Sequence, residues 1–280
     1  MMGAAASVFR EQASWIPPQE DPAGDDSVVE YDVPPFIRQY KSGRVERYGR
    51  ADAVPAAGTD DASSRDVVVN PGTGLWARLY LPGAAVTSRR RIPVVVFHHG
   101  GGFVAGSTAQ RSTHAYLKRL AADAGVLVVS PEYRLAPEHP LPAALDGSWW
   151  EALAAGATIA HNMAARAGFG DALDLSVFKG LVLVHPFFAG EQAIGGEPAD
   201  RVKAGTFWRY RCPGTTAGLD DALCNPFADG GASACAARVA ACCESVLVCV
   251  AEKDALRDRG VRTATRRGRC TRASWTSLRQ

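Results

Sequence analysis

Runs of consecutive apolar residues alternate with a helix-like segment in the middle of the chain. Ile92–His98 (IPVVVFH) and Gly125–Ser130 (GVLVVS) are almost entirely apolar, which is typical of strands buried on both faces of a parallel sheet. Ser112–Ala124 lies between them and has the pattern of a helix. A strand, a helix and a second strand in this order predict a right-handed parallel crossover.

Further apolar runs extend this pattern in both directions. Leu181–His185 (LVLVH) and Ser245–Val250 (SVLVCV) predict two more buried strands, and Arg65–Asn70 with Leu75–Leu81 predict a hairpin around an intervening Pro-Gly-Thr-Gly turn. We therefore predict an α/β fold with a mostly parallel sheet flanked by helices. In such sheets the chemistry lies at the carboxyl ends of the strands.

The segments outside these runs differ in composition. Residues 1–28 are polar and rich in Pro and Gly, which predicts a mobile N-terminus. Residues 29–50 mix aromatic and basic side chains and predict a short helix and a strand over a site, followed by a loop that ends near residue 64. The sheet domain then spans 65–260, and 261–280 form an Arg-rich tail.

Composition narrows the class of protein. Apolar residues make up 47% of the chain and the formal net charge is +2, as in ordinary globular proteins. No stretch approaches the ~20 apolar residues that span a bilayer, and the N-terminus lacks the pattern of a secretory signal. We expect a cytoplasmic protein, with the nucleus as a further location, in which thiols stay reduced.

Neither a metal nor a nucleic acid is expected as a partner. The seven cysteines all lie between Cys212 and Cys270, in spacings that match no zinc site, and we expect no metal and no cofactor. From Arg257 onward the chain has eight arginines and a single acid, Asp258. Such a basic tail can bind nucleic acid, but its one aromatic residue, Trp275, and the lack of a known module argue against it. The oligomeric state stays open.

Three consecutive glycines follow the predicted strand Ile92–His98. The backbone N–H groups of Gly100, Gly101 and Gly102 can stabilise a developing oxyanion, a contribution of ~3–4 kcal/mol per donor, and the His99 side chain can pin the loop. The string HGGG is typical of the oxyanion hole of esterases and lipases. A glycine-rich turn without a ligand is the alternative.

Longer motifs support the same interpretation. The chain resembles the plant carboxylesterase family, in the hormone-sensitive-lipase branch of the α/β-hydrolases and related to the gibberellin receptors. The resemblance covers roughly residues 28–261 and implies an α/β-hydrolase fold, a cap segment and loop in 29–64, and a small-molecule ester or carboxylate ligand. It rests on motifs such as VVVFHHGGGFVAGS (94–107), YRLAPEHPLPAA (133–144), KGLVLVHPFF (179–188) and VLVCVAEKDALRDRG (246–260).

The resemblance also implies a Ser-Asp-His triad, of which this chain keeps one member. Asp254 matches the acid, whereas the serine position of the family's Gly-Asp-Ser-Ala-Gly elbow falls on Ala154, followed by Ala155 as the third oxyanion donor. No G-x-S-x-G occurs in the chain, and no histidine follows Asp254 to act as the base. His161 and His185 are expected to be packing residues.

The elbow region is also shorter than the family pattern. Trp150 runs almost directly into the helix that begins near Ala157, where the family has a central strand. We therefore expect the central strand and the last strand to be missing. Either the flanking strands close up, or buried backbone groups stay unpaired at a cost of ~1–3 kcal/mol each.

These features favour one function and leave two others open. By resemblance the chain is a carboxylic-ester hydrolase, with very low activity expected because the nucleophile and the base are absent. A non-catalytic, hormone-receptor-like protein that binds a small ligand is the first alternative. A truncated isoform without a folded function is the second.

Overall fold

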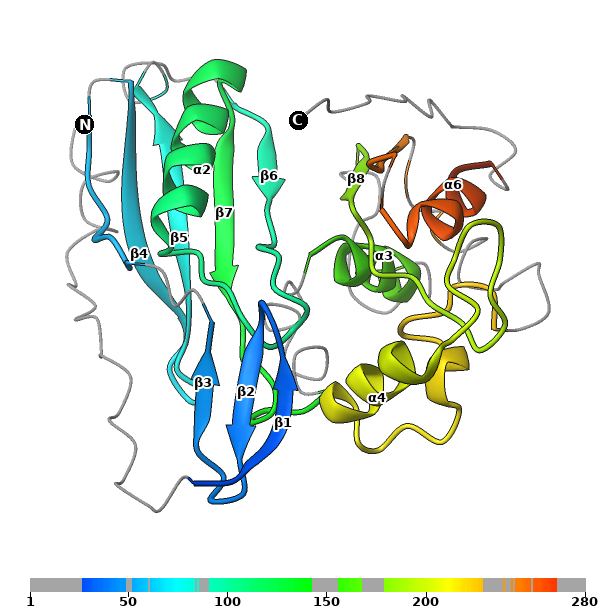
Figure 1. Ribbon diagram of the computed structural model, residues 1–280. Coiled ribbons are helices and arrows are strands. Elements are labelled where there is room, and N and C mark those ends of the chain that lie inside the picture. Colours follow the sequence, from blue (N-terminus) through cyan, green and yellow to red (C-terminus); the bar gives the residue numbers. More distant parts are fainter. Residues whose placement is uncertain are drawn as a thin grey trace, which may run out of the picture.

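The computed structural model describes residues 27–48, 52–59, 61–83, 85, 91–142, 156–167, 179–228, 239, 243, 245–252 and 254–265. In Figure 1 the strands β1 to β7 and helix α2 lie on one side, and α3, β8, α4 and α6 lie on the other. Most of segment 1–28, for which the sequence predicts mobility, falls outside these residues, as do the end of the tail, Ala154 and Ala155.

The larger sheet contains the predicted hairpin and the predicted crossover. Its order is β4-β5-β7-β6, with antiparallel pairing from β4 to β5 and from β5 to β7, and parallel pairing between β6 and β7. The sheet is mixed because strand β5 of the predicted hairpin pairs antiparallel with β7, whose other neighbour, β6, is parallel to it. The elements are β4 (Ala62–Asn70), β5 (Leu75–Pro82), β6 (Val94–Val96), α2 (Arg111–Ala124) and β7 (Leu127–Glu132).

Helix α2 covers one face of this sheet through a small apolar cluster. Leu117 and Ala121 are fully buried against Tyr80 and Val128 of the strands below. The helix stops at Gly125, whose φ of 63° is the left-handed conformation that glycine adopts at helix ends. The helix predicted for Ser112–Ala124 is thus confirmed.

A second, smaller sheet follows in the other half of the molecule. Strands β8 (Leu181–Val184) and β9 (Val246–Cys249) pair in parallel, with α3 (Gly156–Ala167) packed on β8 and α6 (Arg257–Thr265) packed on β9. The core of this unit includes Leu183, Phe188 and Ala164, each at most 1% exposed. Helix α6 runs past Gly260, across the point where the Arg-rich tail was expected to start.

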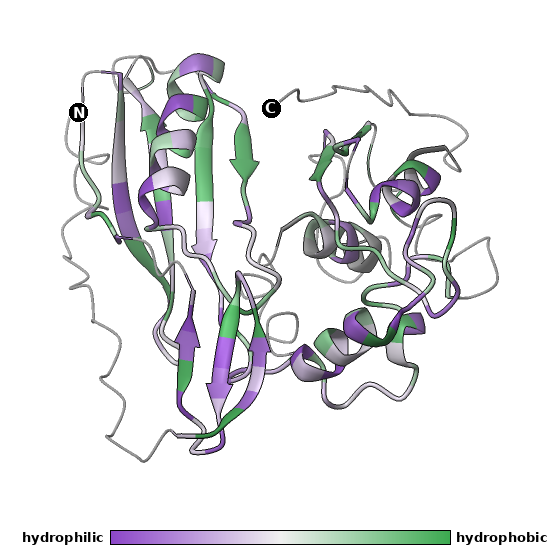
Figure 2. Cartoon of the chain, in the orientation of Figure 1, coloured by the Kyte–Doolittle hydropathy of each residue, from purple (hydrophilic) through white to green (hydrophobic). Residues whose placement is uncertain are grey.

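The two sheets do not join within the described residues. There, β6 pairs only with β7, β8 pairs only with β9, and no strand lies between β6 and β8. One face of each strand is exposed among the described residues, with Val94 at 58% and Val182 at 59%, although Figure 2 shows both strands as hydrophobic. An α/β-hydrolase sheet interrupted at this place is what a missing central strand predicts.

The prediction for residues 29–50 is wrong in one respect. The described part contains no helix and forms a three-stranded antiparallel sheet of β1 (Val29–Val33), β2 (Ile37–Tyr40) and β3 (Val45–Arg47). The reason is the turn at Gly43, whose φ of 90° reverses the chain and lets β3 pair with β2.

Helix α4 (Val202–Arg211) connects the two halves through side chains. Trp208 is fully buried in a cluster with Phe103 and Tyr133 of the first half and Ala189 of the second. Tyr210, on the same helix, stacks on Tyr31 with ring centroids 4.2 Å apart. The loop after β6 and helix α4 therefore provide much of the contact that the interrupted sheet does not.

Candidate active site

The three glycines after β6 adopt a conformation that depends on glycine at one position above all. Gly101 and Gly102 have φ values of 126° and 61°, and Phe103 follows at 69°. The Gly101 carbonyl accepts the N–H groups of Val104 and Ala105, at 3.2 and 3.0 Å. A Cβ on Gly101 would lie 1.9 Å from the Ala105 carbonyl oxygen, so this turn closes only without a side chain.

The turn presents backbone donors. Within the described part of the chain, the N–H groups of Gly100, Gly101 and Gly102 donate no hydrogen bond. Unpaired N–H groups held by a rigid turn are what stabilisation of an oxyanion requires.

His99 supports the turn from below. Its side chain is 2% exposed, its Nδ1 lies 2.8 Å from the Gly100 carbonyl, and its ring stacks on Tyr133 at 4.1 Å. The Tyr133 hydroxyl donates to the His99 carbonyl at 3.2 Å. Burial lowers the pKa of His99 to about 4, so the ring is neutral near pH 7 and Nδ1–H can donate to Gly100.

Three further side chains hold the ends of the loop. Arg47 donates from Nε to the Val104 carbonyl at 2.6 Å, and Glu132 accepts the Thr108 N–H at 2.7 Å. Burial raises the pKa of Glu132 to about 7. Arg211 donates from Nη1 to the Gly102 carbonyl at 3.2 Å. The loop is therefore fixed from several elements.

Asp254 lies where the sequence predicts, just after β9, and it has a partner that the sequence did not indicate. Its Oδ2 lies 3.1 Å from Nδ1 of His185, the residue that follows β8. His185 was expected to be a packing residue, but its side chain is 40% exposed. His161, by contrast, is 1% exposed and packs against Phe188.

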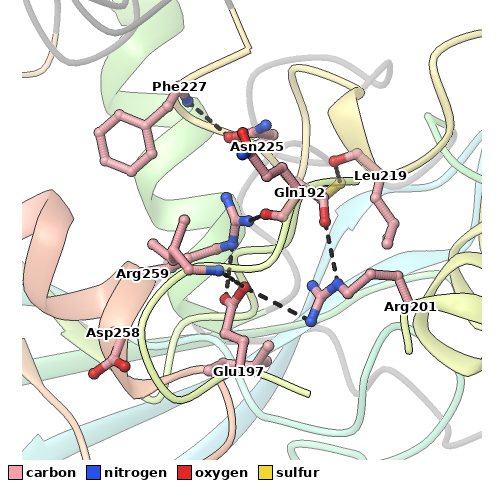
Figure 3. Close-up of polar contacts among 12 residues, drawn as sticks. Gln192, Glu197, Arg201, Leu219, Asn225, Phe227, Asp258 and Arg259 are labelled. Carbon is pink, nitrogen blue, oxygen red and sulfur yellow. Dashed lines mark hydrogen bonds and ion pairs between the residues drawn. The ribbon is translucent and has the colours of Figure 1, made fainter. Parts of the chain in front are cut away.

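A buried ion pair joins the segment that follows His185 to helix α6, which follows Asp254 (Figure 3). Arg259 of α6 donates from Nε to Glu197 at 2.8 Å, with side chains 3% and 0% exposed, and its Nη2 donates to the Gln192 carbonyl. Arg201 lies 3.7 Å from the other Glu197 oxygen. The segment after β8 and the helix after Asp254 are thus fastened to each other.

Arg211 is a buried cation at the meeting point of two loops. It is fully buried, and its guanidinium lies 4.3 Å from the ring centroid of Phe187 and 5.6 Å from that of Phe103. Its Nη2 has no hydrogen-bond partner among the described residues, and burial lowers its pKa to about 9. The HGGG loop and the loop after His185 therefore contact the same side chain.

Of the predicted site residues, the structure describes Gly100, Gly101, Gly102, His99 and Asp254, whereas Ala154 and Ala155 lie outside the described residues. The roles assigned to all of them stay predictions. Among the described residues, no group of three or more His, Cys, Asp or Glu side chains is arranged to hold a metal ion. No helix in the described ranges is both long and apolar enough to cross a bilayer.

Comparison with known proteins identifies a family. A family model for the α/β hydrolase fold matches residues 95–154 and 153–274. A chloroplastic tuliposide A-converting enzyme of Tulipa gesneriana is 38% identical over 92% of this chain and 73% of its own length. A probable carboxylesterase of Arabidopsis thaliana is 35% identical, over 83% of this chain and 81% of its own. The solved Pyrobaculum calidifontis esterase has a TM-score of 0.55 at 26% identity, over 76% and 75% of the two chains.

These relatives correct the expected location. The tulip enzymes are named as chloroplastic or amyloplastic, which points to a plastid and overturns the expectation of a cytoplasmic protein. The lack of an apolar secretory signal does not distinguish a cytosolic from a plastid protein, because plastid import uses leaders of a different, Ser- and Arg-rich composition.

Proposed function

The chain belongs to the plant carboxylesterase-like family of the α/β-hydrolases, and from this premise we propose that it binds small carboxylic esters and hydrolyses them far more slowly than an ordinary esterase. The observation that carries the proposal is the HGGG loop. Its glycine conformation, its N–H groups without a partner among the described residues and its fixed ends suit an ester carbonyl.

The weakness of catalysis follows from the residues at the other triad positions. Ala154 stands at the family's serine position, and the chain has no histidine after Asp254. Without a nucleophile and the usual base, oxyanion stabilisation and binding together leave at most ~10³–10⁴ over the rate in water. The break of the family match at residues 153–154, where the central strand and elbow were expected to be missing, supports this account.

The location and the substrate class are part of the proposal. The relatives favour a plastid, and their names favour small ester substrates without defining the acyl or alcohol group. An activated ester such as p-nitrophenyl acetate is therefore the appropriate first substrate.

Hydrolysis of p-nitrophenyl acetate by the purified chain, with and without a serine-reactive phosphonate, tests the proposal. We expect slow turnover that the phosphonate does not change. Turnover like that of an ordinary esterase, abolished by the phosphonate, would show a working serine nucleophile and refute the proposal.

A second candidate, binding of a small carboxylate without turnover, is favoured by Arg211. A buried cation whose Nη2 lacks a partner within the described residues, and whose surroundings are aromatic, is costly until an anion approaches it. Carboxylates such as acetate and benzoate should then raise the melting temperature, and their methyl esters should not. Equal shifts from acids and esters would argue against it.

A further inference from the structure

We propose that His185, positioned by Asp254, acts as the base of this chain and activates water directly for attack on an ester held by the HGGG loop. The inference rests on the proposed function and names the residue that performs its slow hydrolysis. It replaces a base that sequence order places after Asp254 with one that lies 69 residues before it.

The pair has the orientation that base catalysis requires. Nδ1 of His185 faces the Asp254 carboxylate at 3.1 Å, so that Nδ1–H donates to Oδ2 and the lone pair is left on Nε2. No described residue donates a hydrogen bond to Nε2. In a Ser-His-Asp triad the aspartate holds the imidazole in this same tautomer while Nε2 takes the proton.

Backbone contacts fix both members. The His185 N–H donates to the Cys249 carbonyl at 2.9 Å, which extends the ladder between β8 and β9 by one residue. Asp254 accepts the Leu256 N–H on Oδ1 at 2.9 Å, which directs its other oxygen at the imidazole. The carboxylate therefore has one oxygen for the backbone and one for His185.

The conformation of His185 is unusual for a residue that only packs. Its φ is 48°, one of two positive values among the described non-glycine residues. Such strain is commonly kept where a side chain must point in a particular direction. The side chain is 40% exposed, so water reaches the ring.

Helix α6 holds the two residues in place. Arg259 and Glu197 pair across the helix and the segment after β8, as described above. Gly260 packs closely on the strand ends, because a Cβ there would lie 2.7 Å from Val250 and 3.7 Å from Pro186, the neighbour of His185. The pair therefore belongs to a packed unit.

The HGGG loop and the segment after His185 contact the same side chain, that of Arg211. Arg211 contacts Gly102 on one side and Phe187, two residues after His185, on the other. Phe103 and Ala189 lie in one buried cluster. Both loops follow strands whose carboxyl ends carry the chemistry in this class of fold.

The reaction needs no reagent beyond water. Nε2 of His185 takes a proton from water while the water oxygen bonds to the ester carbon and the carbonyl electrons move to the oxygen, which the N–H groups of Gly100, Gly101 and Gly102 stabilise. The tetrahedral intermediate then reforms the C=O bond and breaks the bond to the alcohol oxygen. That oxygen takes the proton from the imidazolium, giving the acid and the alcohol.

The test is the hydrolysis of p-nitrophenyl acetate by His185→Ala, with added imidazole. General bases typically contribute about 10²–10⁴-fold, so we expect a loss of about 10²-fold or more, with partial recovery in imidazole. His139→Ala, which removes an exposed histidine, should keep the wild-type rate and show no such recovery. Equal urea midpoints for the variants would show that the loss is not one of folding.

The positioning role of Asp254 is tested separately, by the hydrolysis rates of a single and a double variant. Asp254→Asn should lower the rate because the amide no longer favours the correct tautomer. The double variant His185→Ala/Asp254→Asn should be no slower than His185→Ala, since Asp254 acts only through the imidazole. A further loss in the double variant would contradict this.

Two outcomes would overturn the inference, and they have different consequences for the proposed function. Slow hydrolysis that His185→Ala leaves unchanged removes the inference and keeps the function. No hydrolysis above the buffer rate by the wild-type chain removes both.

Discussion

Gly100 and Gly101 are neighbours with opposite tolerance for a side chain. A Cβ on Gly100 meets nothing within 4 Å, whereas one on Gly101 meets the Ala105 carbonyl at 1.9 Å with a φ of 126°. The sequence identifies the glycine string, but it does not tell which glycine is required. That depends on how the chain turns back on itself at Val104 and Ala105.

Gly101→Ala should therefore lower the free energy of unfolding by roughly 3 kcal/mol and weaken ester hydrolysis, because the turn cannot close around the added methyl group. Gly100→Ala is the matched control and should change stability by less than about 1 kcal/mol. Urea unfolding of both variants measures the difference. Similar midpoints would mean that the loop is not closed as described.

Glu132 makes the stability of the HGGG loop depend on pH. Its pKa rises from 4.5 to about 7 on burial, so folding favours the protonated form. The resulting stabilisation is complete below pH 4.5 and is lost as pH rises through about 7. Glu132→Gln keeps an acceptor for the Thr108 N–H and cannot ionise.

Between pH 4.5 and 7 the wild-type chain should therefore lose up to about 3 kcal/mol relative to Glu132→Gln. Urea midpoints of both chains across this range give the comparison. Parallel curves would contradict the buried position of the carboxyl group.

At the scale of elements, strand β8 is buried on one face and exposed on the other. Leu183 is fully buried under α3, and Val182 on the opposite face is 59% exposed. The apolar run LVLVH predicts a strand buried on both faces, which is correct for one face only. The opposite face is exposed among the described residues, and the apolar run by itself does not show this.

Leu183→Ala should cost about 2–5 kcal/mol and Val182→Ala less than about 1 kcal/mol, since only the first removes buried contacts. Thermal or urea unfolding of the pair provides the measurement. Equal costs would imply that another segment covers the exposed face of β8 in solution.

The ion pair between Glu197 and Arg259 attaches α6 to the segment after β8. Removing one partner leaves a buried charge, so Arg259→Met should destabilise the chain by about 3–5 kcal/mol. Arg201, 3.7 Å from the other Glu197 oxygen, still balances part of that charge, so the double variant Arg259→Met/Arg201→Met, which removes both cations, should be less stable than Arg259→Met alone. Equal stability of the two variants would contradict the contact between Arg201 and Glu197.

At the scale of the whole molecule, the sequence predicts strands β4 to β9, helix α2 and the family, because each leaves a local pattern or a long motif. It does not predict the pair of His185 and Asp254, whose members are 69 residues apart and meet only when β8 and β9 align. Nor does it predict that Arg211 joins the two halves, because an arginine in a helix gives no sign of burial among aromatic rings.

The glycine turn after β6 is the proposed oxyanion loop, and His185 lies 3.1 Å from the proposed acid Asp254, while the central strand and nucleophile of the family are expected to be missing. A scaffold of this kind should bind esters and turn them over slowly.

The rate of p-nitrophenyl acetate hydrolysis, measured with and without a serine-reactive phosphonate, tests this central claim most directly. The account predicts turnover well below the ~1 s⁻¹ of a slow ordinary enzyme, unchanged by the phosphonate. A turnover of about 1–10³ s⁻¹, typical of enzymes and abolished by the phosphonate, would contradict it.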